Sequence, residues 1–87
     1  MAADTLIIVP TYNERDNLPQ LVKRLMAQPA VLDILVVDDH TIFRAGMRRL
    51  MSDEPDLRVT GEAADSAEAL AAVRTQRFDV VLMDIHL

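Results

Sequence analysis

The chain has 87 residues, of which 51% are hydrophobic and 26% are charged, and its formal net charge is -5. This length suits one small domain, and the hydrophobic content is sufficient for a core. The acidic balance argues against nucleic-acid binding, which needs a basic face. The absence of cysteine excludes disulfides and thiol catalysis, and it suits a cytoplasmic protein. No apolar run approaches the roughly twenty residues that cross a bilayer, so we expect neither a membrane span nor a signal peptide.

Four short apolar runs predict β-strands. The first, residues 6–9, is mostly β-branched and stops at Pro10, and the second covers residues 34–37. The third, residues 57–62, alternates apolar with polar side chains, which predicts an edge strand with one solvated face. The fourth, residues 80–83, is continuously apolar. Such a run is typical of a buried parallel strand.

Three helical patterns lie between these runs. The first, residues 18–26, repeats apolar side chains at helical spacing. Thr41 is a candidate cap for the second helix, and Ser66 for the third. Glu68 falls in the first turn of the third helix, where the helix dipole favours an acid. The apolar stripe predicted for the second helix is Phe43, Met47, Leu50 and Met51, and that for the third is Ala67, Leu70, Ala71 and Val73.

The resulting order, β-α-β-α-β-α-β, is typical of a parallel sheet with right-handed crossovers. We therefore predict one α/β domain over residues 1–87, a small three-layer sandwich with a four-stranded parallel sheet, flavodoxin-like or Rossmann-like. Two strand orders remain open: strand 6–9 lies either between strands 34–37 and 80–83, or beyond strand 80–83. The short connection between the third and fourth strands favours the second order. An apolar strand near the chain end suggests an open sheet edge and a homodimer formed through it.

Acidic residues follow two of the predicted strands. Asp38 and Asp39 come directly after one strand, and Asp84 comes after another. Ligands of parallel α/β sheets bind beyond the carboxyl ends of the strands, and oxygen ligands there suit Mg²⁺. A carboxylate beside Mg²⁺ can attack a phosphoryl group, because the metal offsets charge on the phosphoryl oxygens. The competing interpretation is that each aspartate only caps the helix that follows it.

We expect the polar residues after this acidic pair to have structural roles rather than functional ones. His40 is interpreted as a cap or a surface residue rather than a metal ligand. Arg44, Arg48 and Arg49 are interpreted as a solvated helix face rather than a nucleic-acid patch.

Residues 34–40, 43–50, 59–64, 68–70 and 78–84 together resemble the first part of a response-regulator receiver domain of the NarL/FixJ type. The resemblance implies that Asp84 is the phospho-acceptor of a two-component phosphorelay. It also implies that Asp38 and Asp39 hold Mg²⁺, with the backbone carbonyl of His86 as a further ligand. The phosphoryl group would come from a histidine kinase or a small phosphoryl donor. Receivers continue with further strands that supply a hydroxyl and a lysine, so we expect a truncated module without complete activity, and not an enzyme.

Residues 7–14, 17–18 and 35–39 carry a second resemblance, to the start of a family 2 glycosyltransferase of the polyprenol-phosphate mannose synthase kind. It implies that Pro10, Tyr12, Glu14 and Asp38 line a pocket for a nucleotide-sugar. The sequence after Asp39 departs from that family's pattern. We therefore interpret the chain as a chimera, with a glycosyltransferase-like βα element in residues 1–32 and a receiver-like βαβαβ unit in residues 33–87. The alternatives are a nucleotide-sugar-binding fragment and a chimeric fold without activity.

Overall fold

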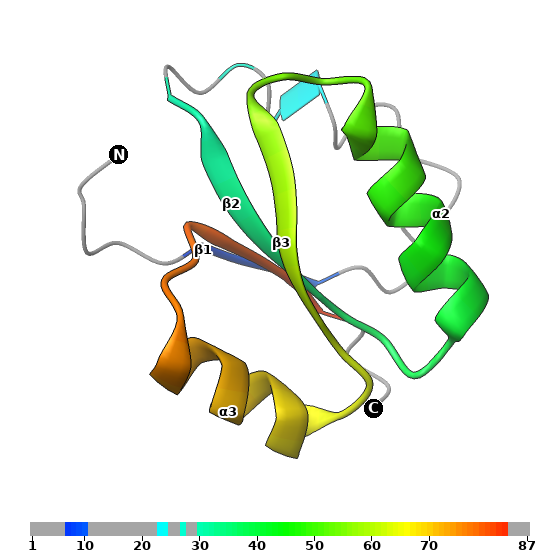
Figure 1. Ribbon diagram of the computed structural model, residues 1–87, viewed down its shortest axis with the longest axis vertical. Helices are drawn as coiled ribbons and strands as arrows, with labels where there is room; N and C mark the ends of the chain where they lie inside the picture. The colour runs from blue at the N-terminus through cyan, green and yellow to red at the C-terminus, as the bar shows by residue number, and fades with distance from the viewer. Residues whose placement is uncertain (1–6, 11–22, 25–26, 28–29, 84–87) are drawn as a thin grey trace.

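The computed structural model describes residues 7–10, 23–24, 27 and 30–83. Within them, four parallel strands form one sheet in the order β1-β4-β2-β3 (Figure 1). The strands are β1 (Ile7–Pro10), β2 (Leu32–Val37), β3 (Leu57–Ala63) and β4 (Val80–Met83). The prediction of a small α/β fold with a parallel sheet is confirmed.

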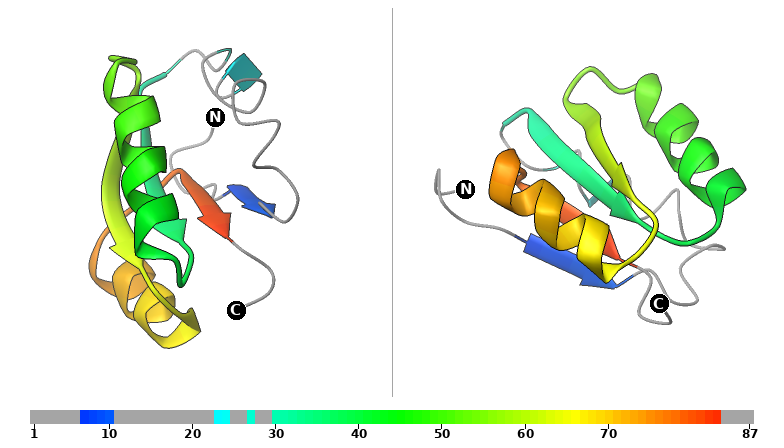
Figure 2. Two further views of the ribbon diagram at one scale, coloured as in Figure 1. Left: turned by 90° about the vertical axis from the view of Figure 1, so that its right-hand side faces the viewer. Right: turned by 60° about the horizontal axis from the view of Figure 1, so that its bottom comes forward.

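The position of β4 decides between the two strand orders left open above. β4 pairs with β1 on one side and with β2 on the other, so β1 occupies the outer edge (Figure 2, right). This is the order that the connection lengths favoured. β2, β3 and β4 come from the receiver-like part of the chain, and β1 joins their sheet from outside that part. β1 and β2 do not pair with each other, because β4 lies between them.

The expectation that the strand near the chain end leaves an open edge is wrong for β4, which has a neighbour on each side. The outer strands of the described sheet are β1 and β3. A homodimer formed through an edge therefore stays a prediction. β3 is an edge strand, as its alternating sequence predicted.

Helices α2 (Thr41–Ser52) and α3 (Ser66–Thr75) cover opposite faces of the sheet (Figures 1 and 2). The side chains of β2 alternate between the two faces, and all four apolar residues of its run are buried. Ile34 and Val36 belong to the core cluster that contains α2 residues, whereas Leu35 and Val37 belong to the cluster that contains an α3 residue. Burying a side chain of this size stabilises the folded state by roughly 1.5–3 kcal/mol. β2 contributes such side chains to both core clusters, so it is central to the hydrophobic core.

Helix α2 buries the face that its sequence predicted. Met47 and Met51 are fully buried, and Phe43 packs against the same core cluster. Leu50 lies at the margin of that face and is exposed. Most of the first helix, expected over residues 18–26, lies outside the described residues. Lys23 and Arg24 belong to this range and are described, and both are helical.

Helix α3 turns a different face to the sheet from the one predicted. Ala69 is buried and Ala72 is packed against the core, whereas Leu70 is 50% exposed and Val73 is also exposed. Ala69 and Ala72 contribute to the same core cluster as Phe78 and Leu35. The predicted face also contained the alanines Ala67 and Ala71, but both are exposed, so the prediction chose the wrong side of the helix rather than the wrong type of residue.

The caps of the two helices also differ from the prediction. α3 is capped by Asp65, not Ser66: its carboxylate accepts a 2.8 Å hydrogen bond from the Glu68 backbone N–H. Glu68 reaches back to accept a hydrogen bond from the Ala64 N–H, in the manner of a capping box. The cap position of α2 is His40, not Thr41, and it makes no side-chain cap hydrogen bond.

One bulge interrupts the pairing of β2 with β3. Ile34 pairs with Val59 but Leu35 pairs with Gly61, so Thr60 is the extra residue. The side-chain amide of Gln76 donates a 3.1 Å hydrogen bond to the Thr60 carbonyl. Gln76 follows α3, so this bond connects the end of that helix to the bulge.

Candidate functional site

The candidate site lies where β2 ends and α2 begins. The backbone N–H of Asp38 donates a 3.0 Å hydrogen bond to the carbonyl of Ala63, which extends the sheet pairing past the last residue of β2. The side chain of Asp38 is only 2% exposed, and it is the one buried charged side chain among the described residues. A buried carboxylate costs free energy unless hydrogen bonds compensate it, so its partners decide what this site can do.

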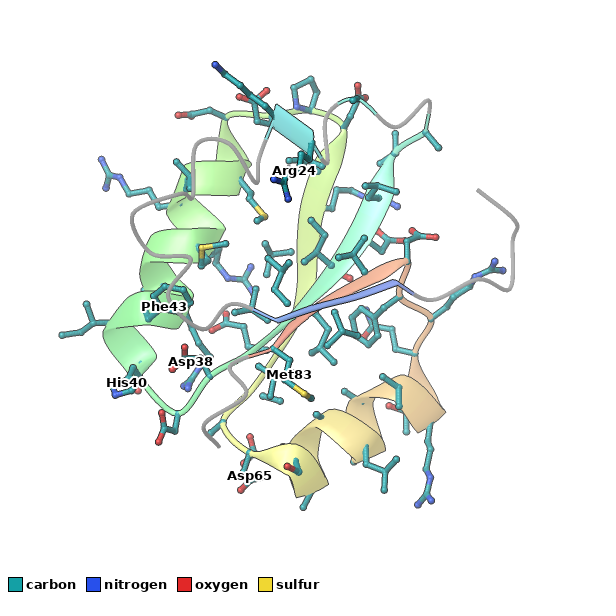
Figure 3. All side chains as sticks on the ribbon, turned by 180° about the vertical axis from the view of Figure 1, so that it is seen from behind. Arg24, Asp38, His40, Phe43, Asp65 and Met83 are labelled. Carbon is teal, nitrogen blue, oxygen red and sulfur yellow. The ribbon has the colours of Figure 1, made fainter. Side chains whose placement is uncertain are left out.

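His40 supplies that compensation. Asp38 Oδ1 accepts a 2.8 Å hydrogen bond from the His40 backbone N–H. The same oxygen lies 2.7 Å from His40 Nδ1, within hydrogen-bond distance. The same Nδ1 lies 3.0 Å from Asp39 Oδ1. Nδ1 thus faces a carboxylate oxygen of each acid. Figure 3 shows Asp38 and His40 together at the start of α2. We call Asp38, Asp39 and His40 the acidic corner.

The acidic corner has the geometry of a cation site. Each of its three residues offers a ligand atom, and these atoms lie within 4.8 Å of one another. Asp39 and His40 are exposed, so water can complete the coordination of an ion. Mg²⁺ binds through one or two carboxylates and keeps several waters, and this donor set fits that habit. His40 lies at the cap position of α2 and is exposed, in agreement with its interpretation as a cap or surface residue, and its ring also contacts both acids, which was not predicted.

The neighbouring strand ends at the same rim of the sheet. β4 pairs with β2 so that Met83 lies opposite Val37. These two residues directly precede Asp84 and Asp38 in the sequence. Asp84 and His86 themselves lie outside the described residues, so their predicted roles as phospho-acceptor and metal ligand stay predictions.

Arg44 does not belong to a solvated helix face, contrary to the prediction. Its side chain is 16% exposed, and its Nη1 donates a hydrogen bond to the main-chain carbonyl of Asp38. Its Nε donates to Glu62 on β3 at 3.3 Å. Arg48, which is 52% exposed, pairs with the other carboxylate oxygen of Glu62 at 2.8 Å. Arg49 is exposed, as predicted.

The residues predicted to line a nucleotide-sugar pocket are not brought together by the described sheet. Pro10 is the last residue of β1, and its register partner is Met83 of β4. β4 therefore separates the strand that carries Pro10 from the one that leads to Asp38. Tyr12 and Glu14 lie outside the described residues.

The comparison with protein families gives this site its context. The family model of the response regulator receiver domain matches residues 34–87, which is more than half of the chain. The chain belongs to the response regulator receiver domain family. No solved structure matched the chain.

The curated relatives are response regulators. The chain is 42% identical over 57 residues to the response regulator UvrY of Escherichia coli K12, a match that covers 66% of this chain and 26% of UvrY. It is 40% identical over 57 residues to the response regulator GacA of Pseudomonas syringae, covering 66% of this chain and 27% of GacA. It is 36% identical over 56 residues to the transcriptional regulatory protein DegU of Brevibacillus brevis, covering 64% of this chain and 24% of DegU. The chain thus spans about a quarter of the length of these relatives.

The glycosyltransferase resemblance of residues 1–39, and with it the chimera, receives no support from these comparisons. The matched family segment begins at residue 34, inside β2. Within the described part of the chain, no helix is both long enough and apolar enough to span a bilayer.

Proposed function

We propose that this domain accepts a phosphoryl group on Asp84, with Asp38 and Asp39 holding the Mg²⁺ that the transfer requires. The observation that carries the proposal is the buried Asp38 carboxylate beside the exposed Asp39 at the end of the central strand. The register of β2 and β4 supports it, because Val37 and Met83 are partners and each directly precedes an aspartate in the chain. The backbone carbonyl of His86 as a further ligand rests on the family resemblance alone.

The transfer is a substitution at phosphorus. A carboxylate oxygen of Asp84 forms the new bond to phosphorus while the bond to the donor breaks, and the donor leaves with that electron pair. Bound Mg²⁺ would offset the negative charge on the phosphoryl oxygens. The task of Asp38 and Asp39 is to bind the cation. His40 holds the two carboxylates together before a cation arrives, because its Nδ1 lies 2.7 Å from Asp38 Oδ1 and 3.0 Å from Asp39 Oδ1.

The partner that this chemistry requires is a phosphoryl donor. A phosphohistidine of a histidine kinase or a small acyl phosphate fits, because both carry a phosphoryl group on a good leaving group. The names of the relatives as response regulators support a histidine kinase.

Metal binding is tested first. Mg²⁺ affinity is measured by its competition with Mn²⁺, whose binding is followed by water-proton relaxation. We expect Asp39→Asn to weaken Mg²⁺ binding by at least about tenfold, since it removes a charged oxygen ligand. Asp53→Asn is the matched control, because it removes the same charge from an exposed residue at the other end of α2. Equal affinities for the two variants would contradict the assignment of the site.

Phosphoryl transfer is tested with acetyl phosphate and Mg²⁺. Mass spectrometry of the intact protein should show the addition of one phosphoryl group, which Asp84→Asn abolishes and chelation of the metal prevents. A protein that neither binds Mg²⁺ nor gains a phosphoryl group would be a fold without this activity, and the proposal would be wrong.

A further inference from the structure

Arg44 connects three parts of the structure around the acidic corner. It lies near the start of α2, and its Nη1 donates to the main-chain carbonyl of Asp38. Its Nε donates to Glu62 Oε1 at 3.3 Å, and its Nη2 lies 3.5 Å from Thr41 Oγ1. A planar guanidinium with donors in a fixed arrangement suits this role, because several bonds together determine its orientation.

One of these contacts, the bond to the Asp38 carbonyl, holds the peptide that joins the two acids. The N–H of Asp38 is bound to Ala63 of β3 at 3.0 Å, and the carbonyl of Asp38 is bound to Arg44. That carbonyl and the N–H of Asp39 belong to the same planar peptide unit. Fixing the carbonyl therefore fixes the direction in which the chain continues from Asp38 to Asp39. The relative orientation of the two carboxylates depends on it.

Arg44 has two opposing effects on metal affinity. Its bond to the Asp38 carbonyl favours binding, whereas its positive charge disfavours binding, because it repels the Mg²⁺ ion. Glu62 reduces this effect, since its two carboxylate oxygens pair with Arg44 and Arg48. Removing either arginine deletes one positive charge from the same cluster. Of these two arginines, Arg44 alone bonds to the Asp38 carbonyl in the described structure. The two effects can thus be separated by comparing the two arginines.

We propose that Arg44 is a positioning residue for the metal site: it orients the Asp38–Asp39 peptide so that both carboxylates can bind one divalent cation. This inference rests on the proposed function, in which these acids hold Mg²⁺. Outer partners of metal ligands typically change metal affinity by about 10- to 100-fold when they are removed. We expect the lower end of that range, because Arg44 acts through the backbone rather than through a ligand atom.

The test compares Arg44→Met with Arg48→Met in the Mn²⁺ and Mg²⁺ titration described above. Arg44→Met should weaken the affinity about tenfold. Arg48→Met should leave the affinity unchanged or raise it slightly, because it removes only charge. Arg44→Lys keeps the charge but cannot make the same set of bonds, so it should also bind more weakly. Equal affinities of Arg44→Met and the unmodified protein, or of Arg44→Met and Arg48→Met, would overturn the proposal.

A second measurement needs no metal, and it separates this inference from the proposed function. In the metal-free protein, the ¹⁵N order parameter of the Asp39 N–H should be near 0.85 and should fall toward about 0.6 in Arg44→Met. It should not change in Arg48→Met. Thermal unfolding verifies that both variants are folded, and Arg44→Lys replaces Arg44→Met if the latter is not. A protein that binds no metal would refute the proposed function, whereas an unchanged order parameter in the Arg44 variant would refute the role of Arg44.

Discussion

The two glycines of the chain occupy opposite environments, and alanine should affect them with opposite sign. A Cβ at Gly61 in β3 would lie 2.7 Å from Phe78 Cζ and 3.2 Å from Leu35 Cδ1. A Cβ at Gly46 in α2 would meet no atom within 4 Å. We therefore expect Gly61→Ala to lower the free energy of unfolding and Gly46→Ala to raise it.

The size of the stability loss expected for Gly61→Ala follows from these distances. Non-bonded carbons are normally about 3.5–4.0 Å apart, so the Phe78 ring would have to retreat by about 1 Å. The ring is 5% exposed and packed in the core, so it cannot simply swing away. Overpacking of this kind costs about 1–3 kcal/mol, and the reduced freedom of the unfolded chain offsets only about 0.4–1 kcal/mol. We expect a net loss of about 1–2 kcal/mol, or roughly 4–16 °C in Tm for a domain of this size.

The assay is urea denaturation followed by far-ultraviolet circular dichroism. Gly46→Ala is the matched control and should gain up to about 1 kcal/mol from helix propensity. Combining Gly61→Ala with Phe78→Leu should recover part of the loss, since the smaller side chain makes room for the methyl group. The reasoning would be refuted by a Gly61→Ala protein at least as stable as the unmodified one.

Two further predictions concern α3, and both are checked by the same denaturation assay. Asp65→Ala should cost about 1 kcal/mol because it removes the cap, whereas Ser66→Ala should change stability by less than about 0.5 kcal/mol; the reverse order would identify Ser66 as the cap. Ala69→Leu should cost about 1–3 kcal/mol, because it forces a large side chain between the helix and the sheet. Leu70→Ala, at a half-exposed position, should cost clearly less than Ala69→Leu, and a larger loss for Leu70 would show that the predicted face was right after all.

Local sequence patterns located the strands well. The runs at residues 34–37, 57–62 and 80–83 all lie within strands of the sheet, with ends that differ by at most two residues. A run of β-branched residues between turn signals carries this information by itself, because side-chain shape and burial restrict it to a strand. The same patterns could not place Gly61 beneath an aromatic ring, since Phe78 is distant in the sequence.

The site was predicted less completely than the fold. Asp38 and Asp39 were identified because acids that follow a strand of a parallel sheet converge at its carboxyl edge. His40 was correctly assigned to a cap or the surface, but its contacts with both acids were not predicted, and Arg44 was wrongly assigned to a solvated helix face. Their short spacing from Asp38, at two and six residues, was visible, but the spacing does not show which way a side chain turns. Arg44 bonds to the Asp38 carbonyl and to Glu62. Glu62 lies on β3, and the sequence alone does not show that it is beside α2.

The amino-acid sequence alone determined the kind of fold, the edge position of β3 and the acids that follow β2. Each of these three features is encoded by residues that are close together in the sequence. The tertiary structure decided that β4 separates β1 from β2, that α3 packs through alanines, and that the backbone of Asp38 is held from both α2 and β3. Each of these depends on contacts between segments far apart in the chain. Such contacts are selected by how well whole surfaces fit together, which no single segment specifies.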